Sequence, residues 1–289
     1  AALTAAEATL AAAARLAGDL GLGVAQGGMI DTPNGDWYAF MFQDRGALGR
    51  APVLMPMHFE DGFPIIGENG KVPEVVTVLD TGYQYAAING SDDFFYKPDE
   101  NGQITLKNFW EFNHQQMDDF WSVTENPGHL RLHSAKLSPT LFQAYNTLTQ
   151  RTVGPKCAAE VTLRFAHMKN GDVAGISTFI GNYGFTGVKK ENDQFYLIMM
   201  GRPAKDTTVF GQFEYENPGL EYARVPIYGE SICLRAEADF TDKRDLSSFY
   251  YKEGDNWQKL GIDQPMYFKM DLFTGCRFDL FYYSTEQTG

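Results

Sequence analysis

Apolar and polar side chains alternate in short runs along residues 24–289, and turn-forming residues separate these runs. Alternation with a period of two, enriched in β-branched and aromatic residues, is typical of half-buried β-strands. The pattern predicts two early strands, over residues 36–43 and 52–59. Later in the chain it predicts strands over residues 129–133, 158–165, 173–181, 184–189, 194–200, 231–240, 247–251 and 276–283.

Turn signals fall between the later runs, for example Lys169-Asn170-Gly171-Asp172 and Glu253-Gly254-Asp255. No helical period appears after Pro155. Short strands that are joined by hairpin turns, without crossover helices, pair with their neighbours in antiparallel sheets. The sequence therefore predicts an all-β fold in which residues 107–289 form an antiparallel two-sheet β-sandwich that folds as a unit.

The N-terminal part of the chain consists of three segments that differ in composition. Residues 1–23 are rich in alanine, with Thr4 and Glu7 spaced as a capping box and Gly21 as a stop, so they predict a short leading helix. Residues 24–80 predict two to four strands of the kind found in one propeller blade. Residues 81–106 carry several turn dipeptides and are interpreted as a linker. A single blade has an apolar face, so we expect it to dock on the sandwich and to offer a surface for oligomer formation.

Composition narrows the classes of partner. Aromatic residues make up 14% of the chain, beside 29 Gly and 13 Pro, which suits turn-rich β structure and also sugar binding. The net charge of −13 and the pI near 4.8 argue against a nucleic-acid partner. No run of apolar residues is long enough for a transmembrane helix, and residues 1–23 have no basic start and no strong apolar centre, so they match a signal peptide poorly. Both a cytoplasmic and a secreted location are consistent with the sequence.

The chain has three cysteines, Cys157, Cys233 and Cys276, which lie far apart in the sequence. Their spacing matches no metal-binding motif, and an odd number leaves at least one thiol unpaired. Each lies in an apolar, strand-like run, so we expect three buried free thiols without a redox or catalytic role.

The turn between the two early strands, DRGALGR, gathers Asp44, Arg45 and Arg50. Strand–turn–strand units with charged residues at one turn line polar pockets in propellers and barrels. Two interpretations of Arg50 stay open: its guanidinium binds vicinal sugar hydroxyls, or it pairs with Asp44 across the turn. Asp31 begins a turn of its own, DTPNG, and is interpreted as a turn residue, not as a catalytic carboxylate.

Residues 26–73 closely resemble the last propeller blade of glycoside hydrolase family 43, the β-xylosidases and α-L-arabinofuranosidases. Further blocks resemble the concanavalin-like β-sandwich (jelly roll) that follows the propeller in that family. They occur in this order: FWEFNH at 109–114, WSVTENPGHLRL at 121–132, NTLTQR at 146–151, KNGDVAGI at 169–176, YGFTGV at 183–188, and FTGCRFDLFYYSTEQTG at 273–289.

The resemblance implies an inverting glycosidase. Such enzymes need a carboxylate base and a carboxylic acid roughly 6.5–9.5 Å apart, with a third carboxylate that tunes the acid. In the family these groups come from earlier blades, and no residue of this sequence matches them. The resemblance further implies that Gln26, in the segment QGG, lies near the propeller axis and that Arg50 hydrogen-bonds the innermost sugar. Leu22 and Gly23 stand where family members often carry a histidine, so a structural Ca²⁺ has no support, and we expect no cofactor and no metal.

The sandwich contains aromatics that could stack on sugar faces, namely Trp110, Phe112, Trp121 and Tyr183. Trp residues in a sandwich are also common core residues. The predicted substrate-binding set is therefore Arg50, Gln26, Asp44, Trp121 and Trp110, with no catalytic residue assigned. His129 and His133 lie about 13 Å apart if on one strand, too far to share a metal.

Three functions remain for comparison. We expect a hemicellulose-directed protein that binds xylan or xylo-oligosaccharide, with inverting hydrolysis impaired or absent. The first alternative is an active β-xylosidase or arabinofuranosidase with a rebuilt site. The second is a truncated fragment that folds as a sandwich and has no activity alone.

Overall fold

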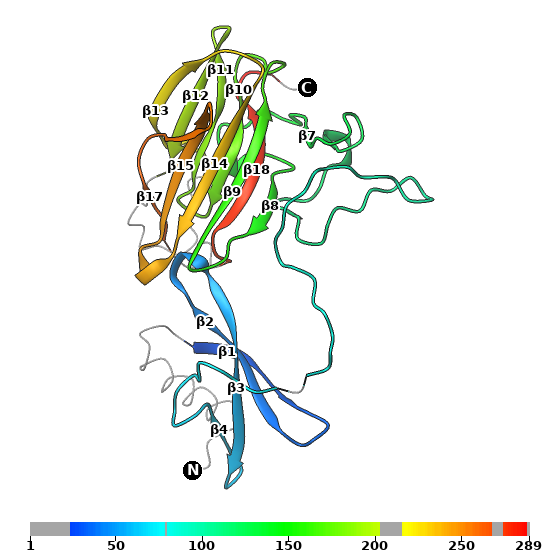
Figure 1. Ribbon diagram of the computed structural model, residues 1–289, viewed down its shortest axis with the longest axis vertical. Coiled ribbons are helices and arrows are strands. Elements are labelled where there is room, and N and C mark those ends of the chain that lie inside the picture. Colours follow the sequence, from blue (N-terminus) through cyan, green and yellow to red (C-terminus); the bar gives the residue numbers. More distant parts are fainter. Residues whose placement is uncertain (1–23, 79, 203–215, 268–273, 288–289) are drawn as a thin grey trace. The chain divides into compact units, whose positions relative to one another are not determined.

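Four consecutive strands pair antiparallel, in the order β1-β2-β3-β4, in the computed structural model of the protein (Figure 1). They are β1 Val24–Asp31, β2 Trp37–Asp44, β3 Arg50–Glu60 and β4 Phe63–Ile66. The structure describes residues 24–78, 80–202, 216–267 and 274–287. The chain divides into two compact units, Ala1–Tyr85 and Ala86–Gly289, so the segment predicted as a linker, residues 81–106, is divided between them. The predicted helix over residues 1–23 lies outside the described residues.

One face of the four-stranded sheet carries the core of the first unit. Its buried members are Val24, Ala39, Met41, Met55, Met57 and Ile66. The predicted strands 36–43 and 52–59 are confirmed as β2 and β3. The strand β1 was not predicted, because the glycines of its QGG segment interrupt the alternation. The turn from β3 to β4 uses Asp61 and Gly62 with φ of 51° and 82°, as hairpin turns of the primed types require.

The second unit is a β-sandwich, as the sequence predicts. Its larger sheet has seven strands in the order β13-β12-β11-β10-β18-β8-β5, and its smaller sheet has five, with the path β16-β15-β14-β9 and β17 paired to β15. The strands of the larger sheet are β5 Glu111–Phe112, β8 Leu148–Arg151, β10 Asp172–Phe179, β11 Gly184–Glu191, β12 Gln194–Gly201, β13 Leu220–Ile227 and β18 Arg277–Ser284. Those of the smaller sheet are β9 Lys156–Arg164, β14 Ser231–Asp239, β15 Leu246–Glu253, β16 Asn256–Lys259 and β17 Gln264–Pro265.

A two-stranded sheet, β6 Trp121–Ser122 with β7 Arg131–Leu132, completes the strands of the described residues. Their helical structure is limited to the 3-10 turns η1 Gly46–Leu48, η2 Asp118–Phe120, η3 Leu141–Gln143 and η4 Thr241–Lys243. The predicted strand over residues 129–133 is wrong in length. Only Arg131 and Leu132 pair, with Ser122 and Trp121, because the chain turns back at Gly128, whose φ is 83°.

The strand β13 was also not predicted. It contains Pro226, which argues against a central strand since proline has no N–H for the ladder. The structure places β13 at the edge of the seven-stranded sheet, paired on one side with β12. An edge strand tolerates proline because one side of the ladder needs no partner.

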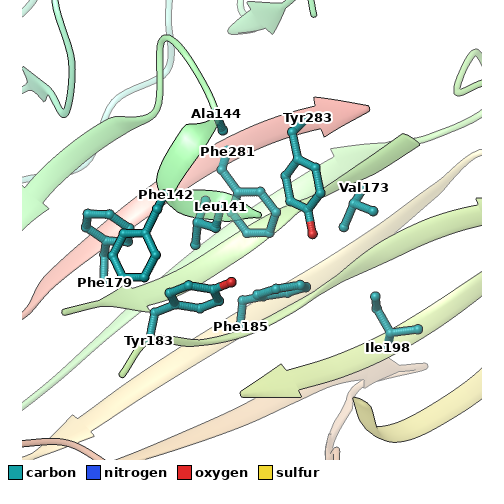
Figure 2. Close-up of a cluster of buried hydrophobic side chains, with 10 residues drawn as sticks. All are labelled: Leu141, Phe142, Ala144, Val173, Phe179, Tyr183, Phe185, Ile198, Phe281 and Tyr283. Atoms are coloured by element: carbon teal, nitrogen blue, oxygen red, sulfur yellow. The ribbon is translucent and has the colours of Figure 1, made fainter. Parts of the chain in front are cut away.

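The central strands of the seven-stranded sheet are covered on both faces. One face packs on the five-stranded sheet, where Phe165 and Val188 share a buried cluster with Leu163 of β9. On the other face, Leu141 and Phe142 of η3 meet aromatic side chains of the sheet, Phe185 and Phe281 among them (Figure 2). Packing on both faces buries β10 over its whole length, whereas the edge strand β13 stays largely exposed.

Candidate functional site

The charged turn of the first unit joins β2 to β3. Asp44 ends β2, Arg50 begins β3, and the two are register partners across the hairpin. The 3-10 turn η1 lies between them, and Gly46 and Gly49 have φ of 61° and 93°. These backbone angles suit glycine, so the sequence GALG closes the hairpin and brings the two charged side chains to the same edge.

The Arg50 guanidinium is held on two sides. Its Nε lies 3.2 Å from Oδ1 of Asp44, and its Cζ lies 4.2 Å from the centroid of the Phe42 ring. The side chains of Arg50 and Asp44 are 21% and 31% exposed. The pairing interpretation of Arg50 is therefore confirmed. It is compatible with ligand binding, because about a fifth of the Arg50 side chain stays exposed.

Gln26 lies in a bulge of β1, the strand next to β2. The register with β2 shifts between Ala25, opposite Phe42, and Gly27, opposite Met41, so Gln26 has no strand partner. Its φ of 43° is left-handed and its side chain is exposed. Gly27 is required at the next position, since a Cβ there would lie 2.0 Å from the carbonyl oxygen of Phe40. The bulge thus presents the Gln26 side chain to solvent beside the strand that carries Phe42 and Asp44.

Gln43 is a polar residue of this region that sequence reasoning missed. It is wholly buried, on the same face of β2 as Ala39 and Met41. Neither polar atom of its amide has a hydrogen-bond partner in the described part of the chain. The sequence signal for this residue is a glutamine at a position where the alternation of β2 calls for an apolar side chain.

Trp110 belongs to the second unit, where its indole N–H is hydrogen-bonded and its ring face is stacked. Its Nε1 donates a 2.7 Å hydrogen bond to Oδ2 of Asp92, and its ring stacks on Phe94 with centroids 5.7 Å apart. Phe109 lies against it at the same separation with a tilt of 57°. These contacts give Trp110 a structural role in anchoring residues 92–110.

Trp121 lies in β6 and packs on Phe112, with ring centroids 5.3 Å apart. Its Nε1 donates a 3.4 Å hydrogen bond to Oδ1 of Asp118, and its side chain is half-buried, so part of the ring stays accessible. Tyr183 was considered as an aromatic that could stack on a sugar, but its side chain is wholly buried in the cluster of Figure 2, so it is a core residue. Burial raises the pKa of Tyr183 to about 12.

A buried carboxyl group, Asp279, was also not foreseen. It lies in β18, is 1% exposed, and accepts a hydrogen bond from the hydroxyl of Ser177 on β10. Burial raises the pKa of Asp279 to about 7, although the hydrogen bonds from Ser177 act in the opposite direction. Its second oxygen, Oδ2, has no hydrogen-bond partner within the described residues.

The cysteine prediction is partly wrong. All three thiols are unpaired, but only Cys276 is buried, while Cys157 and Cys233 are half-buried. Cys233 lies on the outward side of β14, opposite Thr162 of β9, where alternation leaves it partly open. Burial raises the pKa of Cys157, and it raises that of Cys276 well above the usual value.

The described residues contain no group of three His, Cys, Asp or Glu side chains arranged to hold a metal ion. They also contain no helix that is long and apolar enough to cross a membrane. His133 lies 3.3 Å from Glu125, and the ring of His129 faces the Pro127 carbonyl and Arg164, so these two histidines have separate partners.

Comparison with known proteins agrees with the fold. The family model of the β-xylosidase C-terminal concanavalin A-like domain matches residues 99–289. A protein of Xylanibacter ruminicola named "Putative beta-xylosidase" is 29% identical over 177 residues, which cover 61% of this chain and 33% of the relative. The "Beta-xylosidase" of Formosa agariphila is 29% identical over 212 residues, which cover 61% of this chain and 34% of the relative. The chain spans about a third of the length of these relatives.

Solved structures extend the similarity to the first unit. A "bifunctional GH43-CE" protein from Bacteroides eggerthii superposes with a TM-score of 0.79 at 37% identity, over 92% of this chain and 33% of that one. A GH43 glycoside hydrolase with an engineered active site gives a TM-score of 0.77 at 28% identity, over 92% of this chain and 52% of that one. That engineered enzyme displays both endo-xylanase and exo-arabinofuranosidase activity.

Proposed function

Because this chain belongs to the family of β-xylosidase C-terminal concanavalin A-like domains, we propose that it is a hemicellulose-directed protein that binds xylan or xylo-oligosaccharides. The binding site that we propose is the turn between β2 and β3, with Arg50 of β3 as the principal contact and Gln26 of β1, on the other side of β2, as a second contact. The observation that carries the proposal is the geometry of Arg50, which is fixed on Asp44 and Phe42 while a fifth of its side chain stays exposed.

The chemistry of the turn supports sugar binding. A guanidinium that is already held in place loses little side-chain entropy when it donates to neighbouring hydroxyls of a sugar ring. Asp44 keeps the guanidinium oriented, and the Phe42 ring supports its face. The exposed amide of Gln26 adds a donor and an acceptor on the adjacent strand.

The two tryptophans of the predicted set belong to the second unit and are separate contacts in this proposal. Trp121 keeps part of its ring accessible, so a sugar face can stack on it. Trp110 is a weaker contact, because its indole N–H already binds Asp92 and Phe94 already stacks on its ring.

We further propose that the residues of this chain hydrolyse glycosides slowly or not at all by themselves. An inverting mechanism needs an accessible carboxylate base and an accessible acid of raised pKa. Asp279 has a raised pKa, about 7, but it is buried in the sandwich. Asp44 is committed to its ion pair with Arg50. A missing general acid or base costs on the order of 10²–10⁴ in rate.

The test is the affinity of the full chain for xylohexaose, measured by calorimetry, in the wild type and in Arg50→Ala. Hydrogen bonds from a charged group contribute about 1.5–3 kcal/mol, so we expect affinity to fall roughly tenfold to a hundredfold. Arg45→Ala is the matched control, since Arg45 lies in the same turn with an exposed side chain and should leave affinity unchanged. Equal affinities of Arg50→Ala and the wild type would refute the role of Arg50.

The alternative is an active β-xylosidase or arabinofuranosidase, which the names of the relatives favour. Nitrophenyl xyloside and nitrophenyl arabinofuranoside are the substrates that separate the two functions. Turnover within the usual enzyme range of roughly 1–10³ per second would refute the proposal of impaired hydrolysis.

A further inference from the structure

The sandwich has an open hollow of about 520 Å³ at one end. Here the connection between β13 and β14, residues 228–230, meets the hairpin of β15 and β16 and the end of β9. The amide of Phe165 donates a 2.9 Å hydrogen bond to the carbonyl of Glu230, which ties this connection to the end of β9. The hollow lies wholly within the second unit and contains none of the residues proposed above for sugar binding.

Tyr228 forms the rim of the hollow and is 82% exposed. Among the described residues it has no hydrogen bond and no ring contact. Exposed tyrosines elsewhere are partnered: Tyr83 and Tyr85 of the first unit pack edge to face, with centroids 4.7 Å apart. An unpartnered aromatic ring beside a hollow offers a flat apolar face, the feature to which the C–H face of a sugar ring can bind.

The lining adds hydrogen-bonding groups around this ring. Thr162 and Ser231 contribute hydroxyls, Cys233 a thiol and Lys252 an ammonium group, and apolar residues such as Pro226 also line the hollow. None of the described residues that line the hollow is a carboxylate, although the chain has a net charge of −13. A mixture of one exposed ring, several small polar groups and apolar side chains suits a neutral polyol, and the volume falls in the range of roughly 300–1,000 Å³ found for small-molecule sites.

We propose that this hollow is a second carbohydrate-binding site, which takes one pentose unit of a neutral xylan chain against Tyr228. The hydroxyls of Thr162 and Ser231 and the ammonium group of Lys252 hydrogen-bond the sugar hydroxyls. The identity of the sugar rests on the proposed function; the location of the site does not depend on Arg50. A second site of this kind holds a long substrate on the protein without taking part in any reaction.

Cys233 provides a reporter inside the hollow. Its half-buried thiol can be alkylated by iodoacetamide, and the extent of reaction at each cysteine can be read by peptide mass spectrometry. For the wild-type chain we expect saturating xylohexaose to slow alkylation of Cys233 at least fivefold and to leave Cys157 unaffected. Maltohexaose serves as the control oligosaccharide and should give no protection.

Three variants separate the two sites. Tyr228→Ala should raise the xylohexaose concentration that is needed to protect Cys233 about five- to tenfold, since an aromatic contact contributes about 1 kcal/mol. Tyr85→Ala, which removes an equally exposed tyrosine away from the hollow, should leave protection unchanged. Arg50→Ala should also leave it unchanged, even though it weakens total binding.

The outcomes distinguish the two proposals. If Cys233 reacts at the same rate with and without xylohexaose while binding still depends on Arg50, the second site is refuted and the proposed function stands. If xylohexaose protects Cys233 and only Tyr228→Ala raises the concentration needed for protection, the second site is supported whatever the role of Arg50. Protection of Tyr228→Ala at the same xylohexaose concentration as the wild type would also refute the site as described.

Discussion

The indole of Trp110 donates a 2.7 Å hydrogen bond to Oδ2 of Asp92, across 18 positions of the chain. The same carboxylate accepts from the Tyr96 hydroxyl and from the Phe94 amide, and its Oδ1 lies 3.0 Å from Nζ of Lys107. Its side chain is 1% exposed. One carboxylate thus anchors the segment through which the chain enters the second unit.

We predict that Asp92→Asn lowers the free energy of unfolding by about 2–4 kcal/mol, because an amide cannot satisfy so many donors at once. Thermal unfolding followed by circular dichroism should show a midpoint lower by roughly 5–15 °C. Asp93→Asn is the control, since Asp93 accepts a 3.3 Å bond from the amide of Phe95 in an exposed position. Similar midpoints for the two variants would contradict the anchoring role.

Asp92 also predicts a response to acid. Burial by itself would raise the pKa of Asp92, but the hydrogen bonds from Tyr96, Phe94, Trp110 and Lys107 outweigh burial and lower it below 3.8. Its stabilising contribution is therefore present above about pH 4 and is lost as the pH falls through the folded-state pKa. The difference in stability between the wild type and Asp92→Asn should narrow when urea unfolding is measured at pH 3 instead of pH 6.

Asp279 predicts the opposite trend. Its folded-state pKa of about 7 lies above the ordinary 3.8, so the folded protein binds the proton more tightly than the unfolded chain. Stability from this group is fully present below about pH 4 and decreases as the pH rises through 7, by up to about 4 kcal/mol at roughly 1.4 kcal/mol per pKa unit. Asp279→Asn should remove this dependence and be more stable than the wild type at pH 8. Parallel pH profiles of the two proteins in urea unfolding would disprove the prediction.

The bulge at Gln26 predicts a difference between adjacent glycines. In Gly27→Ala the new Cβ would lie 2.0 Å from the Phe40 carbonyl oxygen, whereas in Gly28→Ala it would have no neighbour within 4 Å. A backbone clash of this kind costs about 1–3 kcal/mol. Hydrogen exchange of the β1 and β2 amides should accelerate in Gly27→Ala and stay near the wild-type rate in Gly28→Ala. Equal exchange in both variants would show that β1 does not pair with β2 in this register.

The three thiols should differ in reactivity. Cys276 is buried with a strongly raised pKa, and burial also raises the pKa of Cys157. Since the thiolate is the nucleophile, iodoacetamide at pH 7.5 should modify Cys233 first, Cys157 more slowly and Cys276 only on unfolding. Cys233→Ser should remove the fast phase of labelling. A fast phase that survives this substitution would contradict the order.

The alternation of side chains was sufficient for the smaller sheet of the sandwich because its long strands β9 and β14 turn alternate side chains inward. Runs such as 158–165 and 231–240 therefore appear in the structure nearly as predicted, as β9 and β14. Among the strands that the pattern missed, two have a local sequence that conflicts with their place in the sheet. β1 contains the QGG bulge, and β13 contains Pro226, which is tolerated only because that strand lies at the edge of its sheet.

The sequence by itself determined the strand content, the charged turn that holds Asp44 and Arg50, and the resemblance to family 43, because these depend on residues close together in the chain. Only the tertiary structure decided the surroundings of single side chains. It buried Tyr183, engaged Trp110 with Asp92, raised the pKa of Asp279 beside Ser177, and left Tyr228 exposed at a hollow. Those outcomes depend on contacts between residues far apart in sequence, such as Ser177 and Asp279, and burial and desolvation arise only when the sheets pack.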